Sequence, residues 1–101
     1  ELQIIEDGAF KWTSIEKIFI PPHVSKLCKK IFEHCTKLRR IDIPTNSELQ
    51  IIENCPFEFT PIESIFIPAS VIDIKEKWCS NIKELTTFDV DPRSFHLFLY
   101  F

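Results

Sequence analysis

The chain has 101 residues, of which 45% are hydrophobic and 27% are charged, a balance typical of one folded domain and not of a disordered segment. Its formal net charge is −3, and its twelve Lys and Arg residues are scattered apart from two adjacent pairs, so we expect no nucleic-acid partner. The apolar tail, residues 95–101, is far shorter than the roughly 20 residues of a membrane-spanning helix, so we expect no membrane insertion by this segment.

Four short segments of the chain share one pattern. Each begins with an apolar residue and continues with apolar residues in alternation, and the first three close with Pro. They are residues 15–21, 38–44, 62–68 and 85–90, so that their first positions are almost evenly spaced along the chain. Alternation with a period of two is typical of a short strand with one buried face, and Pro, which has no N–H, marks where such a strand ends. The pattern therefore predicts four short strands.

Each predicted strand is preceded or followed by a second short element with two apolar residues three apart. These elements are Leu2-x-x-Ile5, Val24-x-x-Leu27, Leu49-x-x-Ile52, Val71-x-x-Ile74 and Phe95-x-x-Phe98. Further along each repeat lie Phe10, Phe32, Phe57 and Cys79, and then Thr13, Cys35, Thr60 and Ile82. The turn from Ile43 to Leu49 is two residues longer than the equivalent turn from Ile20 to Val24, so it predicts a bulging loop at residues 44–48.

A nearly constant period in the low twenties indicates stacked coils, each of which buries its apolar side chains against its neighbours. We therefore predict that Lys17–Ile20, Arg40–Ile43, Ser64–Ile67 and Thr87–Val90 are adjacent parallel strands in that order, about 4.8 Å apart. Ile41 and Ile43 are expected to be buried. Heptads and long amphipathic helices do not fit the pattern.

The form Leu-x-x-Ile-x-Ile-Pro, then Val-x-x-Ile, then Ala-Phe-x-x-Cys resembles the BspA-like leucine-rich repeats, a family of surface antigens. Ala9-Phe10 and residues 31–38 match best. The resemblance implies a right-handed solenoid with a parallel β-sheet on its concave face, short β, 3-10 or helical turns on the convex side, and few helices. It also implies adhesion at a cell surface, whereas the residues by themselves do not indicate a compartment.

The repeats divide the chain into one leucine-rich repeat array over residues 1–101. A partial repeat at 1–17 is followed by repeats at 18–40, 41–64 and 65–87 and by a terminal partial repeat at 88–101. The chain has no Met and begins within the pattern at Glu1, so we expect it to be a fragment of a longer array that packs against neighbouring repeats.

The four cysteines do not predict a metal site. Cys28, His34 and Cys35 are close in sequence, but there is no C-x-x-C spacing and no second pair. Cys35 and Cys79 occupy repeat positions that elsewhere hold apolar residues or Thr, which favours buried thiols. A disulfide stays open if the protein is exported, with Cys28 and Cys55 as one candidate pair.

The sequence contains no motif that points to catalysis. It has no Gly-rich phosphate loop, no nucleophile elbow and no H-E-x-x-H sequence. The carboxylates recur at the repeat spacing or beside lysines, as expected of a solvated face. We therefore predict no enzyme, no cofactor and no metal.

The remaining candidate for function is the surface formed by the strand residues that alternate with the buried positions, which we expect on the concave side of the sheet. One ladder across the repeats reads Lys17, Arg40, Ser64, Thr87, and its neighbour reads Phe19, Asp42, Phe66, Asp89. Aromatic residues and Arg are enriched where partners bind. Our hypothesis is that an unidentified protein or extracellular-matrix partner binds at five residues of these ladders: Phe19, Arg40, Asp42, Phe66 and Lys17.

Two alternatives to this hypothesis stay open. A neighbouring segment of the parent chain would also explain the two Phe residues, by covering them. The second alternative is that the array is a structural spacer, or a decayed repeat fragment, with no ligand of its own.

Overall fold

The structure is a computed structural model that describes residues 3–4 and 6–93. Within these residues the regular elements are eight short strands. They are β1 (Gln3–Ile4), β2 (Lys17–Phe19), β3 (Val24–Leu27), β4 (Arg40–Asp42), β5 (Ile51–Ile52), β6 (Ser64–Ile67), β7 (Asp73–Ile74) and β8 (Thr87–Val90). The expected element at residues 95–98 lies outside the described part of the chain.

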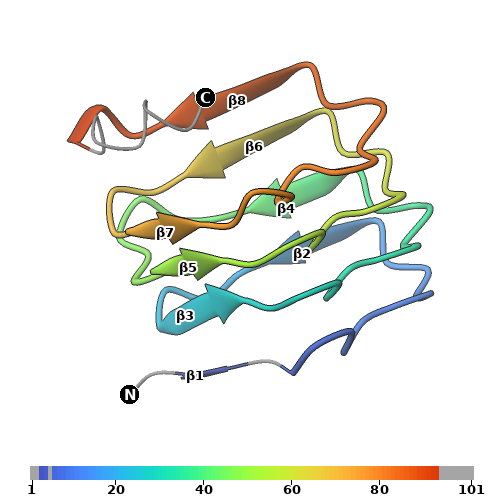
Figure 1. Cartoon of the computed structure of the whole chain (residues 1–101), viewed down its shortest axis with the longest axis horizontal. Coiled ribbons are helices and arrows are strands. Elements are labelled where there is room, and N and C mark those ends of the chain that lie inside the picture. Colours follow the sequence, from blue (N-terminus) through green and yellow to red (C-terminus); the bar gives the residue numbers. More distant parts are fainter. Residues whose placement is uncertain (1–2, 5, 94–101) are drawn as a thin grey trace.

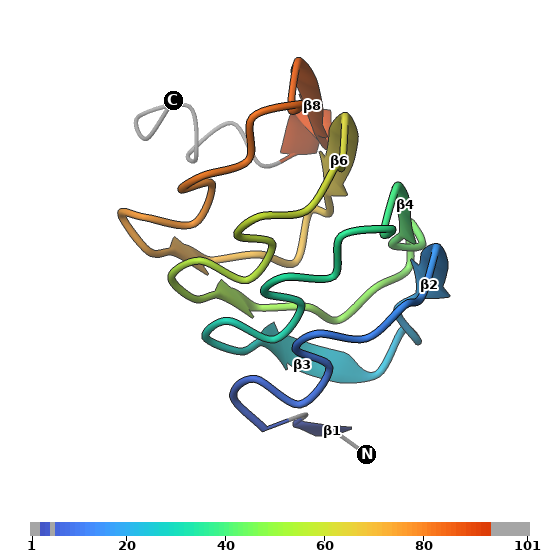
Figure 2. The ribbon, with the colours of Figure 1, turned by 90° about the vertical axis from the view of Figure 1, so that its right-hand side faces the viewer.

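The strands form two stacks on different sides of one coiled chain (Figures 1 and 2). Strands β2, β4, β6 and β8 lie on one side, and β1, β3, β5 and β7 on the other. Every pairing between strands is parallel and joins residues one repeat apart, for example Lys26 with Ile51 and Ile51 with Asp73. The predicted stacking of coils is therefore confirmed.

The second short element of each repeat is itself a strand, and these strands make the longest continuous sheet. The order of that sheet is β1-β3-β5-β7. The spacing of two apolar residues three apart did not reveal it, because each strand is only two to four residues long.

The other stack corrects the prediction of one four-stranded sheet. β2 pairs with β4 and β6 pairs with β8, but β4 and β6 lie next to each other in separate sheets. The interruption falls directly before the longer turn at residues 44–48. In that turn the N–H of Glu48 donates to the carbonyl of Pro22 at 2.7 Å, which ties the loop to the preceding coil. The turn is therefore hydrogen-bonded to the preceding coil, at the level where β4 and β6 separate.

The core runs along the inside of the coils. Ile41 and Ile43 are each 8% exposed, as predicted. Three phenylalanine rings, Phe10, Phe32 and Phe57, stack through the coils with centroids 5.7 Å apart. These stacked rings and the aliphatic side chains around them hold successive coils together.

The fourth coil corrects the position assigned to Cys79. Trp78 is the buried aromatic residue of this coil and meets Phe88 edge to face with ring centroids 5.7 Å apart, whereas Cys79 is exposed. The reason is chain length, because Trp78 follows Ile74 by four residues while Phe57 follows Ile52 by five.

A carboxylate fixes the turn after β8. Asp91 is buried and accepts hydrogen bonds from the backbone N–H, Nε and Nη2 of Arg93 at 2.9, 3.1 and 2.9 Å. These bonds to Arg93 lower the pKa of Asp91 to about 2. A carboxyl group with a lowered pKa contributes stability above its unfolded pKa of about 4, and this contribution is lost as the pH falls through about 2.

The assignment of faces is tested by two adjacent substitutions. Ile41→Asp is expected to lower the free energy of unfolding by about 4 kcal/mol or more, because it buries an unpaired charge between coils. Asp42→Ala changes a partly exposed side chain and should alter it by less than about 0.5 kcal/mol. Urea denaturation measures both, and equal midpoints for Ile41→Asp and the wild type would contradict the assignment.

The contact between Asp91 and Arg93 predicts how the stability of the protein depends on pH. In Arg93→Ala the pKa of Asp91 should rise toward its ordinary value of about 4, as followed by NMR of the carboxyl carbon. The variant should then lose less stability than the wild type between about pH 4 and pH 2. Arg39→Ala, which changes another exposed arginine, is the control and should leave the pKa of Asp91 where it was.

Candidate functional site

The predicted surface residues of β2 and β4 lie directly across from one another. Lys17 pairs with Arg40 and Phe19 with Asp42 in the parallel register. Phe19 is 57% exposed, and Nε of Arg40 donates to Oδ1 of Asp42 at 2.9 Å. The four side chains therefore share one face, with an apolar ring beside an ion pair.

Phe66 differs from the other four residues. It pairs with Asp89 on β8, so it belongs to the second half of the stack. Its ring is only partly exposed and packs against the hydrophobic core. The structure thus brings Lys17, Phe19, Arg40 and Asp42 together on paired strands and places Phe66 on the neighbouring strand.

A polar cleft of about 420 Å³ lies where β4 and β6 separate. Its walls are formed by Arg39, Arg40, Ile41, Asp42, Glu63 and Ser64. Both charge signs are present in it, which gives no net preference for an anion or a cation. Sequence reasoning placed Ser64 in the surface ladder but not among the site residues, and it missed Arg39 and Glu63. Arg39 directly precedes β4 and Glu63 directly precedes β6, so extending each predicted strand by one residue would have included them.

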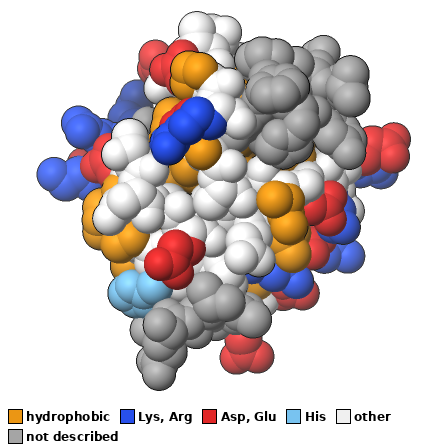
Figure 3. All heavy atoms as spheres, turned by 90° about the vertical axis from the view of Figure 1, so that its left-hand side faces the viewer, with side chains coloured by type: hydrophobic (Ala, Val, Ile, Leu, Met, Phe, Trp, Pro, Cys, Tyr) orange, Lys and Arg blue, Asp and Glu red, His pale blue; other side chains and the backbone are white. Residues whose placement is uncertain are grey.

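The face in Figure 3 carries the turns that lead from one strand stack to the other. Its hydrophobic side chains are scattered among polar ones and do not gather in one broad patch. Nowhere in residues 3–4 and 6–93 is there a helix with the length and apolar character needed to cross a membrane.

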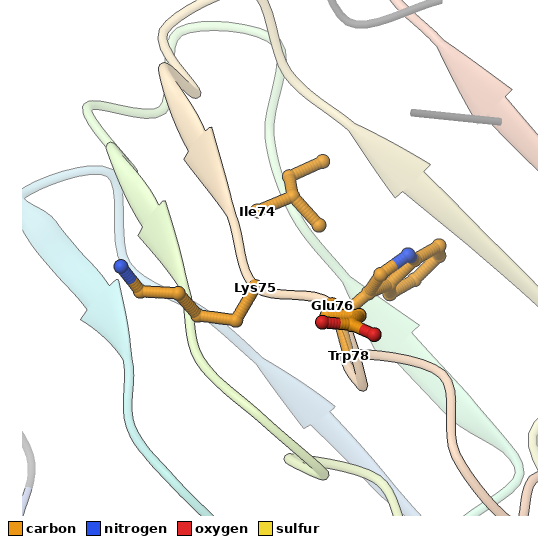
Figure 4. Close-up of a pocket in the computed structure, with 4 residues that line it drawn as sticks. All are labelled: Ile74, Lys75, Glu76 and Trp78. Atoms are coloured by element: carbon orange, nitrogen blue, oxygen red, sulfur yellow. The ribbon is translucent and has the colours of Figure 1, made fainter. Parts of the chain in front are cut away.

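A hollow of about 310 Å³ lies beside β7 and is lined by Ile74, Lys75, Glu76 and Trp78 (Figure 4). The ammonium of Lys75 points away from the carboxylate of Glu76. It donates instead to Oδ2 of Asp73 at 2.8 Å, and this hydrogen bond raises the pKa of Lys75. A lysine held protonated by a carboxylate is a poor nucleophile and a poor base, so the hollow does not offer a catalytic pair.

All four cysteines are free thiols in the structure, Cys28 and Cys55 included. Cys35 is buried, as predicted, and so is Cys28, but Cys55 is only partly buried. Burial raises the pKa of the Cys28 and Cys55 thiols, which disfavours the thiolate needed for nucleophilic attack or metal binding. Among the described residues, no three His, Cys, Asp or Glu side chains are grouped so as to hold a metal ion.

The fold defines the class of protein to which this chain belongs. It is a parallel-stranded solenoid with one coil per sequence repeat, a stacked aromatic core and a strand face that carries exposed aromatic and charged side chains. The sequence pattern described as the BspA type leucine rich repeat region matches residues 3–96 in six copies. The chain belongs to this leucine-rich repeat family, whose members are typically non-enzymatic.

One solved structure extends the comparison. It is the crystal structure of a leucine rich cell surface protein from Faecalibacterium prausnitzii A2-165, with a TM-score of 0.68 and 27% identity. The likeness covers 76% of this chain and 20% of that one, so the chain spans about a fifth of the length of its structural relative. None of the curated proteins matches the sequence.

The placement of Cys79 leads to a labelling prediction. In the native protein N-ethylmaleimide should modify Cys79 first, because its side chain is exposed, and should reach Cys28 and Cys35 only after unfolding. Mass spectrometry of timed samples gives the order. Cys79→Ser should remove the fast-reacting thiol, and equal rates at Cys79 and Cys35 would contradict the position of Trp78 in the core.

Proposed function

We propose that this array is a non-enzymatic protein-binding module of a BspA-like surface protein, which engages a protein or extracellular-matrix partner through the β2-β4-β6 face. The observation that carries the proposal is the group formed by Lys17, Phe19, Arg40 and Asp42 on two paired strands. We call this group, together with Phe66, the strand patch.

The chemistry of the strand patch suits a macromolecular partner. An exposed ring beside an arginine is the combination from which binding hot spots are commonly built. Asp42 holds the Arg40 guanidinium through Nε, so a partner meets a positioned donor rather than a mobile side chain. The ion pair of Arg40 and Asp42 would set the orientation of the partner, and the Phe19 ring would supply the apolar contact.

The adjoining cleft supports the same proposal. It lies beside Arg40 and Asp42 and brings polar side chains from β6 and the segment before it to the edge of the strand patch. A flat patch with one polar cleft fits a protein surface better than a small molecule, which needs an enclosed and mostly apolar pocket.

The surface location is part of the proposal. The structural relative from Faecalibacterium prausnitzii is a cell surface protein, and the family resemblance points the same way. A partner outside the cell, on a host cell or in its matrix, follows if this chain is displayed in the same manner.

Binding to immobilised extracellular-matrix proteins and to host cells tests the strand patch. In the full-length protein, Phe19→Ala should weaken binding by about tenfold or more, because it removes the exposed anchor and leaves the core intact. Phe66 packs on the core, so Phe66→Leu is the cleaner change there and should weaken binding with little loss of stability.

A matched control is available on another part of the surface. Ile72 is a large exposed apolar residue that precedes β7, and Ile72→Ala should leave binding unchanged. Charge reversal at the exposed Glu6 is the control for changes of charge and should also leave binding unchanged. Glu53 is less suitable for this purpose, because its carboxylate is paired with Lys26 at 3.2 Å. If Phe19→Ala binds as tightly as the wild type, the strand patch is not the binding surface and the structural spacer is favoured.

A further inference from the structure

A second aromatic feature lies outside the strand patch. The rings of Trp12, His34 and Phe59 stack face to face, with centroids 4.0 Å and 4.6 Å apart and interplanar angles of 6° and 19°. We call these three residues the aromatic column. Trp12 is 68% and Phe59 42% exposed, which makes them two of the five large exposed hydrophobic side chains of the described chain.

The backbone of the aromatic column is strained. Trp12, His34 and Phe59 have φ angles of 66°, 62° and 64°, in the left-handed region that bulky side chains rarely adopt. Asn81 holds the same place in the next coil with a φ of 57°, and Asn tolerates this conformation well. The chain thus keeps aromatic rings at three positions where Asn or Gly would be less costly. Lys30 and Cys55 also have φ angles of 57°, so the left-handed backbone is a property of these turns.

The strained positions are held rigidly by the coils. The N–H of Trp12 donates to Glu33, that of His34 to Glu58 and that of Phe59 to Asn81, each to the backbone carbonyl at 3.0 to 3.1 Å. The Phe59 ring is therefore fixed in place before any ligand arrives, which lowers the entropy cost of binding at that ring.

The aromatic column ends beside a shallow cleft of about 270 Å³. Phe59 and Pro61 are its apolar lining residues, and the others are Thr36, Thr60, Asn81, Lys83 and Glu84. Thr60 is buried and donates its hydroxyl to the carbonyl of Phe57 at 2.7 Å. The Asn81 amide is positioned by its Nδ2, which donates to Oε2 of Glu58 at 2.6 Å. The cleft therefore combines one aromatic ring with amide, carboxylate, ammonium and hydroxyl groups.

We propose that this cleft binds a single neutral sugar ring of a glycan. A pyranose has one face of C–H groups, which packs on an aromatic ring, and a rim of hydroxyls, which pair with amide and carboxylate side chains. One Lys and one Glu line the cleft, so its charges balance and do not favour an acidic sugar. The volume of about 270 Å³ is slightly below the roughly 300 Å³ at which ligand pockets begin, so the cleft suits one ring and not a longer ligand.

A proline-rich peptide fits the aromatic column less well. Such peptides dock between aromatic rings that are spread apart. Here the three rings are in stacking contact with one another and leave no slot between them.

Saturation-transfer difference NMR on the full-length protein tests the proposal with the methyl glycosides of glucose, galactose and mannose. At least one glycoside should show transfer to its C–H protons. Phe59→Asn removes the ring but keeps a residue suited to φ > 0, and should weaken binding of that glycoside about fivefold or more. Asn81→Gly, which also tolerates this φ, removes the amide and should give a comparable loss.

Trp12→Asn is the matched control, because it makes the same change at the far end of the aromatic column and should leave glycoside binding unchanged. The proposal is overturned if no glycoside gives a signal, or if Phe59→Asn binds like the wild type. It is also overturned if Trp12→Asn abolishes binding equally, or if a proline hexapeptide binds and the glycosides do not. None of these variants touches the strand patch, so failure here is distinct from failure of the protein-binding function.

Discussion

The structure depends on the contact between one coil and the next. No coil of the described chain contains a strand pair of its own, because each strand pairs with a strand one repeat away. The same holds for the core, where Phe10, Phe32 and Phe57 stack on each other from coil to coil. Backbone hydrogen bonds and apolar contacts therefore act along the same axis, and the stability of any coil comes from its neighbours.

Much of this arrangement could be predicted from the sequence, because residues at equivalent positions of successive repeats lie next to each other in the fold. The nearly constant repeat spacing predicted the parallel pairing of Lys17 with Arg40 and, with the alternation inside each strand, the burial of Ile41. The continuous sheet of β1, β3, β5 and β7 was harder to foresee. Two-residue strands are too short to show alternation, and their pairing is imposed by the coils on either side.

The errors fell where the repeat changes its length. One residue fewer between Ile74 and Trp78 moved Cys79 from the core to the surface. Two residues more after Ile43 coincide with the break between β4 and β6. The exposed faces of Phe19 and Arg40 followed from alternation, whereas the stacking of Trp12, His34 and Phe59 did not. These residues lie in left-handed turns, where strand alternation does not apply. The available signal was that each of them follows Phe10, Phe32 or Phe57 by two residues.

The break between β4 and β6 has a mechanical consequence. On one side of the array the strands from β1 to β7 form one hydrogen-bonded sheet, while on the other side the ladder stops at a single level. The array can therefore bend so that β4 and β6 move apart, because no β-ladder joins these two strands. The pairing of β3 with β5 and of β5 with β7 on the other side then serves as the pivot. We expect the array to flex as two blocks about this crease. Phe19 and Phe66 lie on opposite blocks, so the angle between the two blocks sets the distance between these side chains.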